Sequence, residues 1–227
     1  MSRRSGSSPR GGGGAPDPAV RAVRPIDALS AAGIAERLGG RASGLPVPEL
    51  AAGLVPANPQ QAAVLLPLFR IDTAWRLLYI RRAEHPDDHH SGEVAFPGGR
   101  CEPCEREPAA TALREAREEI GLDPRRVEVL GTLTPFHTVS GFLVTPVVGQ
   151  IAWPQPLAPD PSEVARVFSI PLAWLADPAN RQARVWPSPG HPQARQVVFY
   201  DAFDGERLWG VSAAITLDLL TRLSLDR

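Results

Sequence analysis

Three glutamates, Glu115, Glu118 and Glu119, recur at the spacing that places side chains on one face of a helix. Pro108 suits the first helical position and Gly121 is the residue type that ends helices, so we expect a helix between them. At roughly 100° per residue, the three carboxylates fall within one arc. The helix has a second, apolar face of mostly small residues: Ala109, Ala112, Leu113, Ala116 and Ile120.

Carboxylates at this spacing repel one another, so something must offset their charge. Water at an exposed surface does this for most such charge runs. A hard divalent cation is the alternative, because it takes oxygen ligands and, as Mg²⁺, also binds substrate phosphates. Gly98 and Gly99 stand just before the helix and follow the apolar residues 94–96. A glycine pair lets a ligand approach the backbone carbonyls closely, which favours a cation site.

The pattern Gly99-x5-Glu105-x8-Arg114-Glu115-Ala116-x-Glu118-Glu119-x-Gly121-Leu122 resembles the Nudix box. That box is the signature of hydrolases that cleave a diphosphate linked to another moiety. The usual spacing between the first glutamate and the arginine is seven residues, and here it is eight. This extra residue, FPGG at 96–99 and TALREA at 111–116 are similar to the branch of coenzyme A diphosphatases. The likeness covers about residues 60 to 225.

The resemblance implies that Glu115 and Glu119 bind a metal ion, with Glu118 as a third ligand and Gly99 as a backbone ligand. Mg²⁺ is the expected ion and Mn²⁺ the alternative, since all the ligands are oxygens. Such ions would bridge the phosphates and lower the pKa of the attacking water.

The resemblance gives Arg114 the role of an ion-pair partner that orients a box carboxylate, for example Glu105. The alternative for Arg114 is an ordinary surface ion pair. Glu163 resembles a loop glutamate that some Nudix enzymes use as the base that activates water, whereas others use a box glutamate such as Glu118. The alternative for Glu163 is a carboxylate at the start of a helix, where the helix dipole favours it.

Several residues around the box are candidates for substrate binding. Coenzyme A-type relatives carry the pattern R-[SA]-x3-R-x3-G-x3-FPGG; here Arg82-Ala83 and residues 92–99 match it. The segment between them is one residue longer and lacks the second arginine, which argues against coenzyme A. His89 and His90 supply partial positive charge there or are solvated surface residues. Three further residues are candidates to position a base or the pantetheine arm of a substrate: Phe136, His137 and Phe142. For Phe142, packing in the core is the alternative.

Cys101 and Cys104 are the only cysteines, and they lie inside the box. A pair at this spacing is half of a zinc site, a redox dithiol or without a special role.

Composition sets limits on the class of protein. Lys+Arg number 24 and Asp+Glu 25, for a net charge of −1, so bulk binding to nucleic acid or to an acidic membrane is not expected. No apolar run approaches the roughly 20 residues that span a bilayer, and no apolar segment follows the N-terminal charges. We expect a cytoplasmic protein with a small-molecule nucleotide substrate. Family relatives are often dimers, so the resemblance implies a homodimer.

The 227 residues divide into three parts. Residues 1–25 are Gly, Ser, Pro and Arg, and we expect a disordered tail. Residues 26–59 suggest a helical extension that packs against the main domain or a second copy of it. Residues 60–227 form the expected Nudix domain, in which apolar runs predict the following strands: 62–69, 75–82, 127–134, 142–151, 160–168, 182–187 and 196–203.

Pro146 argues for an edge position or a bulge in strand 142–151. Strand 62–69 is apolar throughout, which favours a buried central position. A short helix is expected in residues 170–175, a hairpin between the last two strands, and a final helix over residues 211–225. Together with the box helix, this pattern predicts an α/β fold, the Nudix-type α/β/α sandwich with a mixed β-sheet.

The expected reaction is metal-dependent hydrolysis of the diphosphate of coenzyme A or its derivatives, giving 3′,5′-ADP and 4′-phosphopantetheine. Other nucleoside diphosphates, such as ADP-ribose, NADH or a dinucleotide polyphosphate, are the next candidates. A protein of another class, a Nudix module that binds nucleotides without hydrolysis, is the third. The intact carboxylate set argues against it, because binding alone does not require three clustered carboxylates.

Overall fold

A computed structural model describes residues 25–39, 58–85, 91–138, 140–186 and 195–223. Most of the predicted tail and most of the segment 26–59 lie outside these ranges, as do His89 and His90. The three-part division of the chain therefore stays a prediction. Within the described ranges, no helix has the length and apolar character needed to cross a membrane.

The central strand is β1 (Gln60–Ile71), as its apolar composition predicts. It pairs antiparallel with β2 (Ala74–Arg82) and parallel with β7 (Phe142–Ile151), so the sheet is mixed. The strand order is β3-β2-β1-β7-β5, with β4 on β1, β6 on β7 and β8 on β2. The other strands of this sheet are β3 (Val94–Ala95), β4 (Gly98–Arg100), β5 (Val127–Thr132), β6 (Phe136–His137) and β8 (Val164–Pro171).

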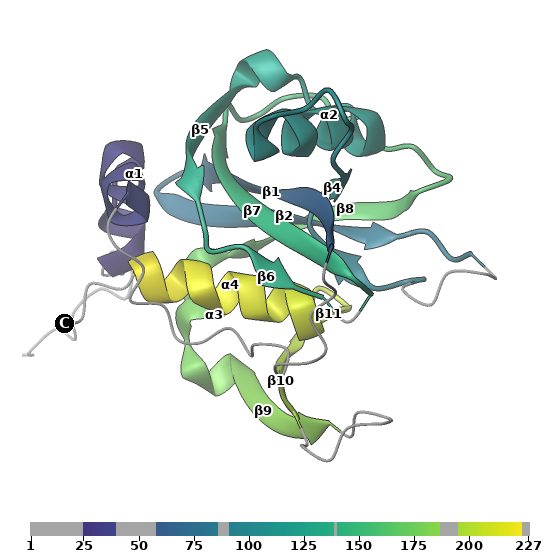
Figure 1. Cartoon of the computed structure of the whole chain (residues 1–227). Helices are drawn as coiled ribbons and strands as arrows, with labels where there is room; N and C mark the ends of the chain where they lie inside the picture. Colours follow the sequence, from purple (N-terminus) through teal and green to yellow (C-terminus); the bar gives the residue numbers. More distant parts are fainter. Residues whose placement is uncertain (1–24, 40–57, 86–90, 139, 187–194, 224–227) are drawn as a thin grey trace, which may run out of the picture.

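Helices cover both faces of this sheet (Figure 1). Helix α2 (Pro108–Ile120) packs on one face, and α3 (Leu172–Ala176) and α4 (Gly210–Leu223) lie on the other. The prediction of an α/β/α sandwich with a mixed sheet is confirmed. Short 3-10 turns precede the first described helix and two of the strands, β5 and the strand that begins at Arg181: Pro25–Ala28, Pro124–Arg126 and Pro178–Asn180.

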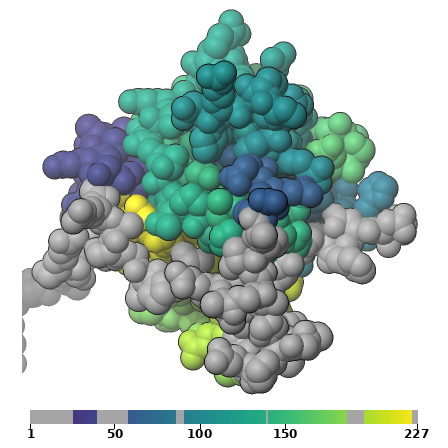
Figure 2. Space-filling model, in the orientation of Figure 1, coloured from purple at the N-terminus to yellow at the C-terminus, as the bar shows by residue number. Residues whose placement is uncertain are grey.

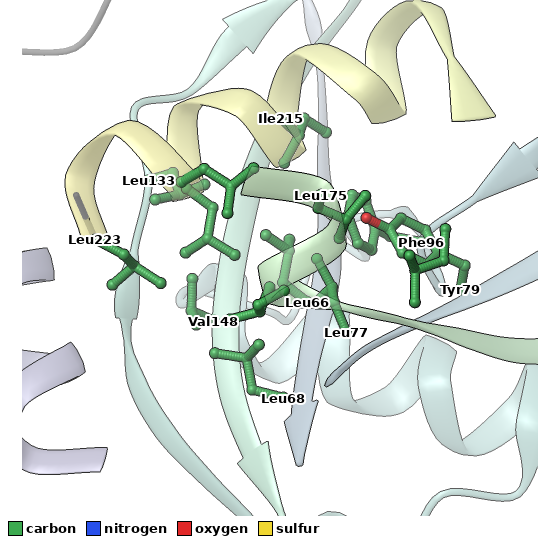
Figure 3. Close-up of a cluster of buried hydrophobic side chains, with 14 of the residues drawn as sticks. Leu66, Leu68, Leu77, Tyr79, Phe96, Leu133, Val148, Leu175, Ile215 and Leu223 are labelled. Atoms are coloured by element: carbon green, nitrogen blue, oxygen red, sulfur yellow. The ribbon is translucent and has the colours of Figure 1, made fainter. Parts of the chain in front are cut away.

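Strand β1 is apolar on both sides because both of its faces are covered. Ala63, Leu65 and Phe69 point toward α2 and belong to one buried cluster. Leu66 and Leu68 point the other way, into a second cluster that fills the space beneath α4 (Figure 3). Burial of each such leucine contributes about 1.5–3 kcal/mol. The packing of both clusters fixes the register of β1, and through it the position of the neighbouring β4.

The predicted hairpin is present as part of a second, three-stranded sheet. Strand β10 (Arg195–Phe203) lies between β9 (Arg181–Trp186) and β11 (Glu206–Trp209), all antiparallel. Arg166 on β8 bonds Asp204 and Glu206, which ties this sheet to the larger one.

The predicted edge position of Pro146 is wrong. Pro146 lies in a central strand, β7, between β1 and the pair β5 and β6. Its carbonyl accepts a hydrogen bond from Leu133 N (2.9 Å), in the break between β5 and β6. The amide hydrogen that proline lacks would point to this same side, where the ladder is already interrupted. The bulge in this region lies in β5, at Leu130.

Helix α1 (Ala31–Gly39) packs against the main domain, along β5 (Figure 2). A Cβ on Gly131 would come within 2.9 Å of Leu38 Cβ, so the glycine permits the close approach of the helix. The segment before α1 is held by Trp75, whose backbone N–H bonds Asp27 (2.9 Å) and whose indole N–H bonds the carbonyl of Leu29 (2.8 Å).

Candidate active site

Helix α2 carries the predicted acidic and apolar faces. Ala112, Ala116 and Ile120 are fully buried against the sheet, and the small alanines bring the helix axis close to β1. Pro108 occupies the first turn, and Gly121 ends the helix in the left-handed conformation (φ 68°). This packing directs the box carboxylates toward β4, at the edge of the sheet.

Glu119 is a buried carboxylate, only 4% exposed. Its Oε2 accepts a hydrogen bond from the backbone N–H of Gly98 (2.9 Å). Burial raises the pKa of Glu119 to about 8, and the charges of Glu115 and Glu163 raise it further, while Gly98 and Arg82 oppose the shift. A cation bound beside Glu119 would reverse this, because it stabilises the ionised form.

Glu115 lies directly on Gly99. A Cβ on Gly99 would come within 2.5 Å of the Glu115 carboxylate carbon, so a side chain there would displace the carboxylate from its present position. At Gly98 a Cβ would come within 2.4 Å of the carbonyl oxygen of Ala63. Burial raises the pKa of Glu115, and the charge of Arg114 partly offsets this. Close contact with the β1 backbone therefore requires glycine at position 98, whereas Gly99 leaves the Glu115 carboxylate where it is.

Arg114 joins three of the carboxylates. Its guanidinium contacts Glu105 Oε1 (2.9 Å), Glu115 Oε1 (3.0 Å) and Glu118 Oε2 (2.8 Å). A further N–H bonds the carbonyl oxygen of Arg100 on β4 (3.0 Å). The ion pair expected between Arg114 and Glu105 is present, and it is part of a network rather than an isolated surface pair.

Glu105 is held in the loop before α2. Its Oε2 accepts hydrogen bonds from the Glu102 N–H (2.9 Å) and the Thr111 hydroxyl (2.7 Å). The bond from Arg114 is the main reason that the pKa of Glu105 falls to about 2. Glu105 thus stays ionised and fixes the orientation of the arginine.

Glu163 and Arg82 reach the same site from β8 and β2. The carbonyl of Glu163 accepts a bond from Ala83 N (2.8 Å), and Asp160 N, in the same turn, bonds the carbonyl of Glu119 (2.9 Å). The charges of Glu163 and Arg82 both act on Glu119. Glu163 precedes a strand, so the alternative of a helix-start carboxylate is wrong.

Phe136 and Phe142 lie on the face of the sheet opposite α2. Phe136 is 9% exposed and belongs to the core beneath α4. Phe142 packs partly against that core, and the Arg100 guanidinium carbon lies 5.6 Å from its ring centre. Cys101 and Cys104 are free thiols in the loop between β4 and α2.

Within the described residues, no three His, Cys, Asp or Glu side chains converge closely enough to form a complete metal site by themselves. Mg²⁺ usually keeps several waters and binds through one or two carboxylates plus substrate phosphates. The buried Glu119 and the cradle of Gly99 beneath Glu115 fit such an ion.

Sequence reasoning missed the part played by Gly98 and Arg100. In a strand, the N–H and C=O groups of one residue point to the same side, and those of the next residue point to the opposite side. The Gly98 N–H points to Glu119 and the Arg100 carbonyl to Arg114, so the polar groups of Gly99 point to β1 instead. No local pattern signals this alternation, because it depends on the pairing of β4 with β1.

The comparisons with known proteins agree with this geometry. The model of the NUDIX domain matches residues 59–203. The chain is 40% identical over 178 residues to the uncharacterized Nudix hydrolase NudL of Pectobacterium atrosepticum, covering 78% of this chain and 90% of that protein. It is 38% identical over 162 residues to the mitochondrial coenzyme A diphosphatase NUDT8 of Homo sapiens, covering 70% of this chain and 68% of that protein.

Among solved structures, a MutT/nudix family protein from Enterococcus faecalis aligns with 74% of this chain and 63% of that chain, at 18% identity and a TM-score of 0.48. The family match spans more than half of the chain and includes every box carboxylate. Members of this family act on small nucleotide substrates and generally use divalent metal ions. The protein belongs to the Nudix hydrolase family.

Proposed function

We propose that this protein is a Mg²⁺- or Mn²⁺-dependent diphosphatase that hydrolyses coenzyme A or its derivatives to 3′,5′-ADP and 4′-phosphopantetheine. The single observation on which the proposal of hydrolysis rests is the buried Glu119 beside Glu115 and Gly98, at the edge of the sheet. The coenzyme A substrate rests on the similarity to NUDT8 and on the FPGG and TALREA segments.

Glu115 and Glu119 are the proposed side-chain ligands of the metal. Glu118 is the third through its other oxygen, because its Oε2 is bound by Arg114 (2.8 Å). The backbone ligand is the carbonyl of Gly98 in place of that of Gly99, because the Gly98 polar groups face Glu119. When bound, the ion supplies positive charge to the diphosphate and lowers the pKa of a coordinated water.

The residues of the chain have separate roles in this proposal. Arg114 holds Glu115 and Glu118 in place and is itself held by Glu105, so it positions ligands and takes no part in bond cleavage. Arg82 provides positive charge near Glu119 that attracts the substrate diphosphate.

Glu163 is the proposed general base, which accepts a proton from the attacking water. Its side chain is exposed, and its charge acts on both Glu115 and Glu119. Glu118 is the weaker candidate for this role, because Arg114 already binds its carboxylate at 2.8 Å. General bases contribute about 10²–10⁴-fold to the rate.

Product release from a panel of diphosphates, with and without Mg²⁺ or Mn²⁺, tests the proposal. The panel contains coenzyme A, its oxidised and acylated forms, ADP-ribose, NADH and a dinucleotide polyphosphate. We expect metal-dependent turnover with the highest kcat/KM for a coenzyme A compound. A higher kcat/KM for another member of the panel would replace coenzyme A as the proposed substrate. No turnover of any member would favour a module that binds nucleotides without hydrolysis.

Replacement of single carboxylates tests the roles within the site. We expect Glu119→Gln to abolish turnover and Glu163→Gln to lower kcat about 10²–10⁴-fold, with circular dichroism spectra like that of the unchanged protein. Glu128→Gln, an exposed position on β5, is the control and keeps full activity. Near-normal turnover of Glu119→Gln would refute the metal assignment.

A further inference from the structure

Arg100 lies two residues after Gly98, the proposed backbone ligand of the metal, but its side chain points to the other face of the sheet. A Cβ on Gly99 would be directed at Glu115, on the α2 side. Side chains alternate along a strand, so the side chain of Arg100 projects from the opposite face. Ala62 of β1 and Val144 of β7 stand in register with it on that face. The backbone of β4 therefore faces the carboxylates, and the Arg100 side chain lies on the face of the sheet opposite α2.

The Arg100 guanidinium rests on a fixed aromatic ring. Its carbon lies 5.6 Å from the centre of the Phe142 ring. The Phe142 backbone is held by Thr138, whose hydroxyl accepts from the Phe142 N–H (3.1 Å) and whose N–H donates to the Phe142 carbonyl (2.8 Å). A guanidinium over the face of a ring still has N–H donors for a ligand, and an arginine can bind a phosphate at two points.

The charge of Arg100 is available for a ligand. Arg114 forms ion pairs with three carboxylates, and Arg166 forms ion pairs with Asp204 and Glu206. Arg100 is exposed, and none of the carboxylates in the described ranges forms an ion pair with it. A polyanionic substrate that extends from the carboxylate cluster around the edge of β4 would reach this cation on the opposite face.

We infer that Arg100, seated on Phe142, binds a phosphate of the substrate other than the scissile diphosphate. The inference rests on the proposed function, in which the substrate carries such a group, the 3′-phosphate of the nucleoside part. Arg100 then supplies the positive charge for a phosphate that the second arginine of the coenzyme A-type pattern would provide and that residues 83–92 lack. The contact selects 3′-phosphorylated nucleoside diphosphates over those without this group, such as ADP-ribose and NADH.

The kinetic test compares coenzyme A with dephospho-coenzyme A, which lacks only the 3′-phosphate. Hydrogen bonds between charged groups of this kind are worth about 10–100-fold. We expect Arg100→Gln to lower kcat/KM for coenzyme A by that factor, chiefly through KM, and to leave the value for dephospho-coenzyme A within about twofold. Arg100→Lys restores part of the loss, since it keeps the charge but not the planar fork.

Arg184→Gln is the matched control. Arg184 is also exposed and also lies over an aromatic ring, that of Phe199 (4.9 Å), but on β9 of the small sheet. We expect it to leave both kcat/KM values unchanged. An equal loss on both substrates in Arg100→Gln would overturn the inference, because it would mean that Arg100 contacts the base or supports the strand. No loss on either substrate would overturn it as well.

A binding measurement separates this inference from the proposed function. Calorimetric titration with adenosine 3′,5′-bisphosphate and with AMP requires no turnover. We expect the unchanged protein to prefer the bisphosphate and Arg100→Gln to lose that preference. If the unchanged protein hydrolyses neither coenzyme A nor its dephospho form, the proposed substrate is wrong, and the titration still decides the role of Arg100.

Discussion

At the scale of residues, one arginine organises the site. Arg114 contacts Glu105, Glu115 and Glu118 and also bonds the carbonyl of Arg100. It thereby reduces the repulsion between carboxylates that share one helix face. These contacts raise the pKa of Arg114 above its ordinary value, chiefly through the bond to Glu105.

Arg114→Lys tests this arrangement. A lysine keeps the charge but cannot reach all four partners at once, because it lacks the planar fork. We expect kcat to fall at least about tenfold and the free energy of unfolding to fall by about 1–3 kcal/mol, the cost of a lost bond between charged groups. Steady-state kinetics and urea denaturation measure the two effects. Arg125→Lys, an exposed pair with Asp123, is the control, and equal effects in the two variants would contradict the role of Arg114.

At the scale of elements, helix α1 covers the edge strand β5. Leu38 of α1 sits against Gly131, where any side chain would collide with it. The helix lies beside β5 in Figure 1, and its buried residues belong to the cluster beneath α4 and not to the one beneath α2, so it supports the fold rather than the carboxylates.

We expect Gly131→Ala to destabilise the protein without a large loss of kcat/KM. The added methyl group must displace Leu38, and overpacking of this kind costs about 1–3 kcal/mol. The midpoint of urea unfolding measures the effect. Gly205→Ala is the matched control, since Gly205 also has a positive φ (81°) but nothing within 4 Å of the added carbon. A midpoint shift in Gly131→Ala no larger than in Gly205→Ala would show that the contact with α1 is unimportant.

At the scale of the whole molecule, the buried Glu119 links stability to pH. Its pKa is raised to about 8, above the ordinary value of 4.5, so the folded protein holds a proton that the unfolded chain releases. Stability must therefore fall as pH rises from about 4.5 through about 8, and remain lower above that range.

We expect the metal-free protein to lose up to a few kcal/mol of stability, about 1.4 per unit of pKa shift, between pH 5 and 9 relative to Glu119→Gln. The difference between the two proteins is the measured quantity, because subtraction removes the contributions of the other titrating groups. The lowered pKa of Glu105 affects stability only below about pH 5, outside this range. Thermal unfolding in a chelator at several pH values provides it. Added Mg²⁺ should restore the stability of the unchanged protein at pH 9, and identical pH profiles for both proteins would contradict the prediction.

The sequence by itself determined the local features of this protein. The limits of α2, its acidic and apolar faces and the course of the main strands follow from the spacing of residues near one another in the chain, and the box identified the family. Tertiary structure decided what depends on pairing between distant segments. It brought Glu163 to the end of α2, placed Pro146 opposite a break in the ladder and laid Arg100 on Phe142. Each of these depends on which strands are neighbours and in what register, and no periodicity within a single segment carries that information.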